Sequence, residues 1–248
     1  MIPRLLHYVW IGGRPLNALG ERCLASWQRH LPGWEIRRWD ETNSPMDNPY
    51  VRTMMERGLP AFASDLIRLH ALWEHGGLYL DTDVELLRNP EDLFPRGDLV
   101  VGLLSLQNRL KKCSIGTSWI AAGPGHPLLR KIRDRYLGLR RAVMNNTIFT
   151  EELLPLFRGQ EFPSHGNFEF FQGPGLRLYH PEFFSPVEQG EAGRIRPRAG
   201  SRSYALHHCA GNWGGQADRL PWWRRVLDSR IDRKILRPIE GLLRKARP

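Results

Sequence analysis

Two carboxylates separated by one residue follow a short apolar segment of the chain. Asp81 and Asp83 flank Thr82, directly after residues 78–80, which are Leu-Tyr-Leu. Side chains two apart on a strand point to the same side, so both carboxylates can converge as the strand ends. Like charges this close repel and raise each other's pKa, which favours a bound cation. Oxygen ligands without a cysteine favour Mg²⁺ or Mn²⁺, ions that share their coordination shell with substrate phosphates.

The helix predicted just before this triplet carries a second polar group. Ser64, Asp65 and Arg68 lie within residues 60–75, and the acid and the arginine are three apart, so they share one helix face. Leucine and isoleucine flank the pair, which argues against a freely exposed face. The pair is therefore either an intrahelical ion pair or a second part of the same site.

The segments around both groups alternate between strand and helix patterns. Strands are predicted at 4–10, 34–39, 78–80, 99–104, 118–122 and 204–208, and helices at 17–31, 50–58, 60–75 and 127–143; residues 160–200 are loop-like. This alternation predicts an α/β fold with a parallel or mixed sheet. We expect one domain over residues 1–221 and a helical tail over 222–248. Ligands of such sheets bind outside the carboxyl ends of the strands, where the triplet lies.

Composition and charge limit the partners. The chain has 248 residues, 41% hydrophobic and 25% charged, and a formal net charge of +10. Residues 222–248 hold nine basic and three acidic residues, so the tail carries +6 and the body is only mildly basic. This distribution weakens a nucleic-acid-binding interpretation. Three widely spaced cysteines argue against a disulfide framework or zinc cluster, and no apolar run is long enough to span a membrane. We expect a cytoplasmic protein.

The tail itself is basic and amphipathic. It is typical of segments that bind anionic lipid, which would place the protein on the inner membrane face near a lipid-linked acceptor. The alternative is a helix that packs on its own domain or on a partner.

The sequence resembles glycosyltransferase family 32, the DXD-motif sugar transferases, whose relatives include capsular polysaccharide enzymes, mannosyltransferases and the catalytic part of the clostridial glucosylating toxins. The matching segments are Ile2–Gly13, Ser26-Trp27, Trp39-Asp40, Ala63–Arg68, Gly76–Asp83, Gly125–Pro127, Gly173-Pro174, Tyr204–His208 and Gly211–Trp213. The resemblance spans most of residues 2–213 and excludes the tail.

This resemblance implies a GT-A-type (Rossmann-like) mixed sheet flanked by helices. It also implies metal-dependent transfer, with retention, from a UDP-sugar or GDP-mannose to a glycan, lipid-linked or other hydroxyl acceptor, as in surface polysaccharide synthesis. Mn²⁺ or Mg²⁺ is the expected cofactor.

By the same resemblance, Val9 and Trp10 contact the nucleotide base, with Trp10 stacking on it. Ser64, Asp65 and Arg68 address the ribose, sugar hydroxyls and phosphates of the donor.

Tyr79 is expected to line the same pocket. Asp81 lies nearer the sugar, and Asp83 is the more direct metal ligand. Of His207 and His208, only one is expected to reach the metal or pyrophosphate, because adjacent strand residues face opposite ways; either assignment is open, with His207 preferred.

Asn212 takes the place of the small hydroxyl residue that usually precedes the tryptophan, here Trp213; both are predicted to bind donor.

Two other classes of function compete: a metal-dependent phosphoryl-transfer enzyme, which would need further acidic ligands, and a non-enzymatic binder of anionic ligands.

Overall fold

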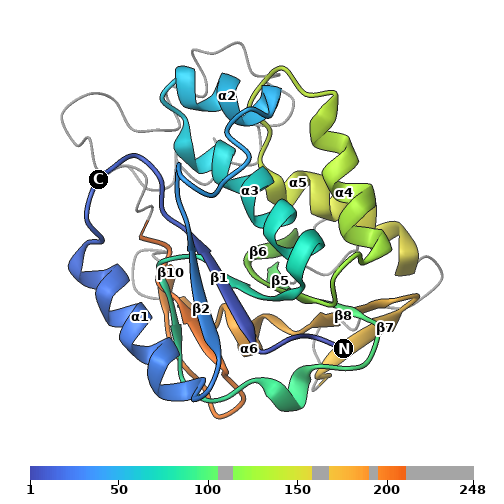
Figure 1. Ribbon diagram of the computed structural model, residues 1–248. Coiled ribbons are helices and arrows are strands. Elements are labelled where there is room, and N and C mark those ends of the chain that lie inside the picture. The colour runs from blue at the N-terminus through green and yellow to red at the C-terminus, as the bar shows by residue number, and fades with distance from the viewer. Residues whose placement is uncertain (106–113, 158–167, 190–194, 211–248) are drawn as a thin grey trace.

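A computed structural model of the chain describes residues 1–105, 114–157, 168–189 and 195–210 (Figure 1). Its centre is a seven-stranded sheet in the order β2-β1-β3-β6-β5-β8-β7. The strands are β1 (Leu5–Val9), β2 (Glu35–Trp39), β3 (Gly77–Leu80), β5 (Leu99–Ser105), β6 (Ser114–Ala122), β7 (Phe170–Gly173) and β8 (Leu176–Tyr179). Only β6 and β7 run against the other strands. The predicted mixed α/β sheet is confirmed.

Helices cover both faces of the sheet. They are α1 (Ala18–His30), α2 (Pro49–Glu56), α3 (Pro60–His75), α4 (Pro127–Leu137), α5 (Asn145–Leu153) and α6 (Pro181–Phe184), with 3₁₀ turns at Glu91–Leu93 and Leu154–Phe157. One apolar core joins α2, α3, α4 and α5 to one face, and a second joins α1 and α6 to the other. Successive side chains of a strand point to opposite faces of the sheet and so belong to different cores. Tyr79 belongs to the first core, whereas Leu78 and Leu80 belong to the second.

The junction between α3 and β3 depends on two glycines. Gly76 ends α3 at φ 65° and Gly77 follows at φ 102°, a region that favours glycine. A Cβ on Gly77 would lie 2.2 Å from the carbonyl oxygen of Leu5, and one on Gly76 would lie 2.6 Å from Pro124. The turn therefore lets β3 lie directly beside β1, which sets the position of the acidic triplet at the far end of β3.

Two small antiparallel sheets stand apart from the central one. One pairs β4 (Val84–Leu86) with β11 (Ala205–His207), and the other pairs β9 (Val187–Gln189) with β10 (Ile195–Pro197). The strand predicted at 204–208 is present as β11, but it lies outside the central sheet and pairs with the three-residue β4. Strand β4 follows the acidic triplet and was too short to predict.

Two other predictions need correction. The helix predicted over 127–143 ends at Leu137, where Gly138 follows, and the separate helix α5 begins at Asn145. Within the loop-like stretch 160–200, the described residues form β7, β8, α6, β9 and β10. These are all short, so their patterns lack the length that periodicity requires.

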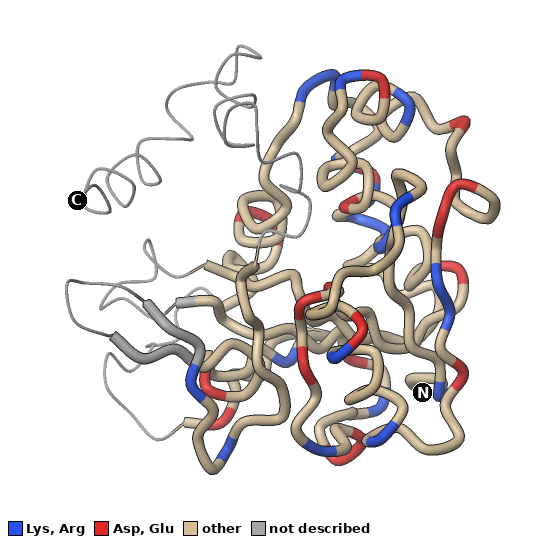
Figure 2. The backbone as a smooth tube through the Cα atoms, turned by 90° about the vertical axis from the view of Figure 1, so that its left-hand side faces the viewer, with Lys and Arg blue, Asp and Glu red and all other residues tan. Residues whose placement is uncertain are grey.

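Charges of both signs are interspersed along the described chain (Figure 2). In the described residues, no helix is long and apolar enough to cross a membrane. The predicted tail, 222–248, lies outside the described residues.

Candidate functional site

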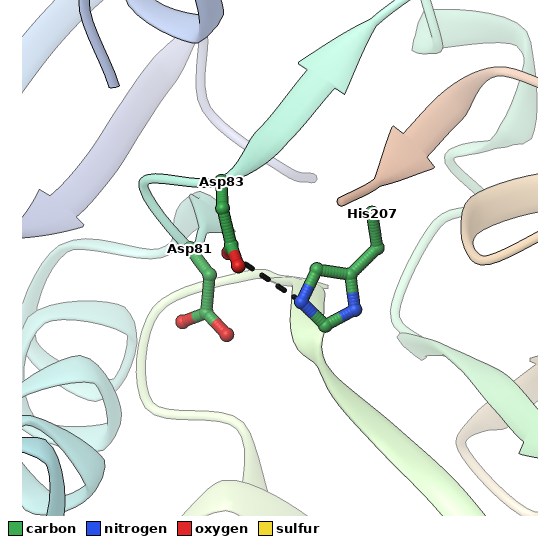
Figure 3. Close-up of side chains that lie close together, drawn as sticks. All are labelled: Asp81, Asp83 and His207. Atoms are coloured by element: carbon green, nitrogen blue, oxygen red, sulfur yellow. Dashed lines mark ion pairs between the residues drawn. The ribbon is translucent and has the colours of Figure 1, made fainter. Parts of the chain in front are cut away.

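The acidic triplet lies in a tight turn between β3 and β4. The backbone N–H of Asp81 donates to the Ser118 carbonyl on β6 (2.9 Å), and the N–H of Val84 donates back to the Asp81 carbonyl (3.0 Å). The turn brings both carboxylates toward one imidazole, that of His207 at the end of β11 (Figure 3). One ligand atom from each of Asp81, Asp83 and His207 lies within 4.8 Å of the others. We call these three residues the cation corner.

Asp83 is the centre of this corner. Its Oδ1 lies 3.4 Å from His207 Nε2 (Figure 3). Its Oδ2 accepts from the backbone N–H of Ala210 at 2.8 Å. Its own carbonyl accepts from the N–H of His208 at 2.9 Å. Burial raises the pKa of Asp83, but the contacts with His207 and the Ala210 N–H outweigh it, so the net pKa lies below its ordinary value. Asp83 is thus held ionised, as a metal ligand must be.

The two adjacent histidines face opposite ways. His208 Nε2 lies 2.9 Å from Oε2 of Glu85, whose carboxylate also lies 3.7 Å from Nε of Arg22. The structure therefore brings His207, and not His208, to the carboxylate pair. Glu85 likewise points to this outer group and does not join the corner.

Arg68 lies beside the corner and contacts five oxygen atoms, through three hydrogen bonds and two ion pairs. Nη1 contacts the Thr117 carbonyl at 2.8 Å and Asp81 Oδ1 at 3.0 Å. Nη2 contacts Asp65 Oδ1 at 3.0 Å and Ser64 Oγ at 3.3 Å, and Nε lies 3.4 Å from the Ser64 carbonyl. Through these ion pairs Arg68 positions the Asp65 and Asp81 carboxylates.

Asp65 is held from a second side by residues that the sequence did not reveal. Asn145, the first residue of α5, donates from Nδ2 to Asp65 Oδ1 at 2.7 Å and accepts from Thr117 Oγ1 at 2.8 Å. Asp65 is only 7% exposed. Burial raises its pKa, Arg68 opposes that shift and Asp81 adds to it; the net pKa lies above the ordinary value. No local signal marks Asn145, because its partner lies 80 positions earlier.

Tyr79 completes this group. Its hydroxyl donates to Asp81 Oδ1 at 2.8 Å, and the Arg68 guanidinium lies 4.6 Å from the centre of its ring. Burial raises the pKa of Tyr79 well above its ordinary value, so the phenol stays a donor. We call the five residues Asp65, Arg68, Tyr79, Thr117 and Asn145 the buried wall. Among the described residues, Oδ2 of Asp81 has no hydrogen bond, so this oxygen remains available to a ligand.

A cavity of about 240 Å³ opens beside the wall and the corner. It is lined by Gly58, Leu59, Pro60, Ala61, Phe62, Asp65, Arg68, Asp81, Leu104, Thr117, Ser118, Met144, Asn145, Asn146 and His207. The arrangement offers acidic and imidazole ligands at one edge of a space that a small organic molecule can enter.

The remaining predicted site residues lie in the core or outside the residues that the structure describes. Val9 is buried in the core on the α3 side, and Trp10 is buried in the core on the α1 side, with its Nε1 donating to the Arg14 carbonyl at 2.6 Å. Neither lines the cavity. Ser64 is fully buried and its hydroxyl donates to the Ala61 carbonyl at 2.7 Å. Asn212 and Trp213 lie outside the described residues.

The corner fits a divalent cation by its chemistry. Two carboxylates and one imidazole form a donor set for a hard or borderline ion, and no thiolate is part of it. A cation would also relieve the repulsion between Asp81 and Asp83.

Residues 20–99 match a protein family described as "Glycosyltransferase sugar-binding region containing DXD motif". The match includes the wall residues of α3 and the whole acidic triplet. No curated protein matches the full sequence.

Solved structures show distant likeness. A glycosyltransferase named PaToxG matches with a TM-score of 0.45 and 16% identity, over 62% of this chain and 71% of its own. A transferase double mutant matches with a TM-score of 0.41 and 11% identity, over 66% and 89%. A glycosyltransferase involved in glycosylation of the major capsid of PBCV-1 matches with a TM-score of 0.41 and 8% identity, over 73% and 84%.

Proposed function

We propose that this chain is a metal-dependent glycosyltransferase that uses a nucleotide-sugar donor, an activity supported by the match of residues 20–99 to a DXD-containing sugar-binding region. The donor is a UDP-sugar or GDP-mannose, the cofactor is Mn²⁺ or Mg²⁺, and the acceptor is a hydroxyl of a glycan or lipid-linked glycan. We further propose that the anomeric configuration is retained and that the product is a surface polysaccharide.

The convergence of Asp81, Asp83 and His207 within 4.8 Å of one another carries this proposal. These residues come from two segments far apart in sequence, and the β4–β11 pairing brings them to one point. Such a group at the edge of a cavity suits a cation that shares its shell with substrate phosphates. Among the described residues this is the one such acidic group, which disfavours a two-metal phosphoryl-transfer site.

The side chains of the site have different proposed roles. Asp81, Asp83 and His207 would hold the cation, which when bound neutralises charge on the departing nucleotide diphosphate. Tyr79 donates to Asp81 Oδ1 and Arg68 forms an ion pair with the same oxygen, which holds the carboxylate in place and leaves Oδ2 for cation or sugar. Since these donors are in place before substrate arrives, little reorganisation is needed during reaction.

Donor hydrolysis tests the proposal, and neighbouring residues supply the controls. A panel of UDP- and GDP-sugars is incubated with Mn²⁺, Mg²⁺ or a chelator, and release of the nucleotide diphosphate is measured. Asp83→Asn and His207→Gln are each expected to lower the metal-dependent rate by at least roughly 100-fold.

Glu85→Gln and His208→Gln make the matching changes, an acid to its amide and a histidine to glutamine, one or two positions away on the outer group, and should retain most activity. Equal losses in inner and outer variants, or full activity in chelator, would contradict the cation site. The anomeric configuration of the product, read by NMR, tests retention.

Membrane attachment through residues 222–248 remains a prediction. The full chain and a form lacking these residues are compared by flotation with anionic liposomes. Equal flotation of the two forms would contradict it.

A further inference from the structure

The positive charge of residues 1–221 is concentrated in one stretch of the chain. The whole chain carries a net charge of +10 and residues 222–248 carry +6, which leaves +4 for residues 1–221. Residues 127–144, which comprise α4 and its connection to α5, carry a net +5 from six basic residues and one acid: Arg130, Lys131, Arg133, Arg135, Arg140, Arg141 and Asp134. We call residues 127–144 the α4 segment. The rest of residues 1–221 is therefore close to neutral.

The apolar side of α4 is buried within the protein. Leu129, Ile132 and Tyr136 belong to the core that joins α4 to the sheet. Five of the six basic side chains are exposed, and the sixth, Arg133, is half-buried with its guanidinium 3.9 Å from the centre of the Trp73 ring. Figure 1 shows α4 on the outside of the molecule. An anionic partner therefore meets a folded, charged surface and not a free amphipathic helix.

Acidic neighbours balance most of the basic residues of α4 itself. Arg130 lies 3.8 Å from Asp134, and Lys131 lies 2.9 Å from Glu152 of α5. Arg135 also pairs with Glu152. The exposed positive charge without an acidic partner consequently lies in the connection that follows the helix.

This connection places unpaired cations next to an exposed apolar side chain. Arg140 and Arg141 are exposed and form no ion pair with the described residues; Arg140 donates only to the Leu139 carbonyl, at 3.5 Å. Leu137, at the end of α4, is 56% exposed. Such a group suits an anionic lipid surface, because the leucine gains from entering the apolar layer while the arginines stay at the headgroups.

The apolar side chain favours a lipid surface over a nucleic acid. Phosphates of either would attract the two arginines. A protein that binds single-stranded nucleic acid usually also offers exposed aromatic side chains on which bases stack. Among the described residues, the large exposed apolar side chains are Leu137 and Met1, neither of which is aromatic.

We propose that residues 137–141 dock on an anionic lipid membrane, with Leu137 entering the membrane interface and Arg140 and Arg141 contacting the headgroups. The connection ends at Met144, which lines the cavity beside the buried wall and the cation corner. The chain from Leu137 to Met144 spans at most about 25 Å, so the docked surface holds this cavity close to the membrane. Docking requires neither the cation nor the donor, so the inference goes beyond the proposed function, and it is independent of the predicted attachment through residues 222–248.

Vesicle binding tests the proposal on the full chain, without metal or donor. Sedimentation with phosphatidylcholine vesicles, with or without phosphatidylserine, gives the affinity for each lipid surface. Arg140→Gln combined with Arg141→Gln should weaken binding to the anionic vesicles by about 30-fold, which is about fivefold for each arginine. The matched control, Arg22→Gln combined with Arg29→Gln, removes the same charge from exposed residues of α1 on the other face of the sheet, and should weaken binding by less than about threefold.

Leu137→Ser separates a lipid surface from other polyanions, because it changes no charge. It should weaken binding to the anionic vesicles about tenfold, since the leucine no longer gains from burial. Binding to heparin or to an RNA oligonucleotide should stay unchanged. All the substituted side chains are exposed, and circular dichroism checks that each variant is folded.

Three results would overturn the inference: no binding of the wild-type chain to anionic vesicles, equal losses in the two arginine pairs, or vesicle binding that Leu137→Ser leaves intact. The last result, with heparin or RNA binding lost in the variant at Arg140 and Arg141, would assign these arginines to a polyanion that has no apolar interior. Failure of the proposed function is separate, because it removes donor hydrolysis and leaves vesicle binding unchanged.

Discussion

The buried wall and the cation corner lie side by side but are built differently. In the wall, Arg68 is 4% exposed and its guanidinium contacts five oxygen atoms of four residues, and Asn145 ties Asp65 to β6 through Thr117. In the corner, two carboxylates and an imidazole rest on a pairing of three-residue strands. The wall balances its charges within the protein, whereas the corner keeps two acids near each other with one histidine. The first is pre-organised, and the second would be completed by the cation that we propose.

The largest effect should come from removing the charge that organises the wall. Arg68→Met leaves Asp65 and Asp81 without their shared cation, so we expect the free energy of unfolding to fall by about 3–5 kcal/mol. Urea unfolding followed by circular dichroism measures it. Arg22→Met, which loses an exposed ion pair with Glu85 at 3.7 Å and an exposed contact with His208 Nε2 at 3.4 Å, should cost about 0–1 kcal/mol. Similar losses in both variants would remove the distinction between wall and surface.

The corner should respond to metal, where the wall does not. Mn²⁺ at about 100 times its Kd is expected to raise the free energy of unfolding by about 2.7 kcal/mol, and EDTA should reverse this. Asp83→Asn should lose the stabilisation, which thermal unfolding detects. Asn145→Ala, in the wall, should keep it. A metal response that survives Asp83→Asn would place the ion elsewhere.

Acid should weaken the structure behind the wall, at the start of β3. His7 is fully buried; its Nδ1 accepts from Trp39 Nε1 at 2.9 Å, and its Nε2 lies 2.8 Å from the Gly76 carbonyl. Burial lowers the pKa of His7 to about 4. The unfolded chain takes up this proton near pH 6.5, so stability is full above that pH and falls toward pH 4.

Between pH 7.5 and pH 5 this histidine should cost about 2 kcal/mol of stability. His7→Gln, though less stable at neutral pH, should lose that part of the pH dependence. Urea unfolding at the two pH values measures the difference. An unchanged slope in His7→Gln would mean that other groups dominate acid sensitivity.

The smallest of these effects should come from the amide that braces the wall. Asn145→Ala removes hydrogen bonds to Asp65 and Thr117 and should cost about 1–2 kcal/mol. Asn146→Ala, which removes one bond to the Ile115 carbonyl, should cost about half as much. Both are measured by thermal unfolding. A larger loss at Asn146 would show that the α5 terminus, and not the wall, depends on these amides.

The sequence predicted the parts whose signals are local. The strands at β1 to β3 and the helices α1 to α3 follow long patterns with clear ends, and the carboxylates of the triplet stand two apart. Long-range pairing was not visible in this way. Choosing between His207 and His208 requires the register of β11 on β4, in which His207 pairs with Val84.

The full set of contacts that Arg68 makes could not be predicted from the sequence either. Spacing placed Arg68 on one helix face with Asp65, but two of its partners, Asp81 and Thr117, come from other strands and turns. Asn145 reaches Asp65 from a helix that was not predicted. Residue types and spacing therefore indicated the chemistry, while only the fold shows which groups are free to act.

The pairing of β4 with β11 has a consequence for the order in which the enzyme becomes active during synthesis. The last strand of the central sheet ends at Tyr179, and the wall uses no residue beyond Asn145. His207 leaves the ribosome later than both. A nascent chain can therefore acquire its sheet and wall first, while His207 reaches the cation corner afterwards and closes a long loop. Chains truncated shortly before Ala205 would keep the sheet and the wall and lack the imidazole of the cation corner.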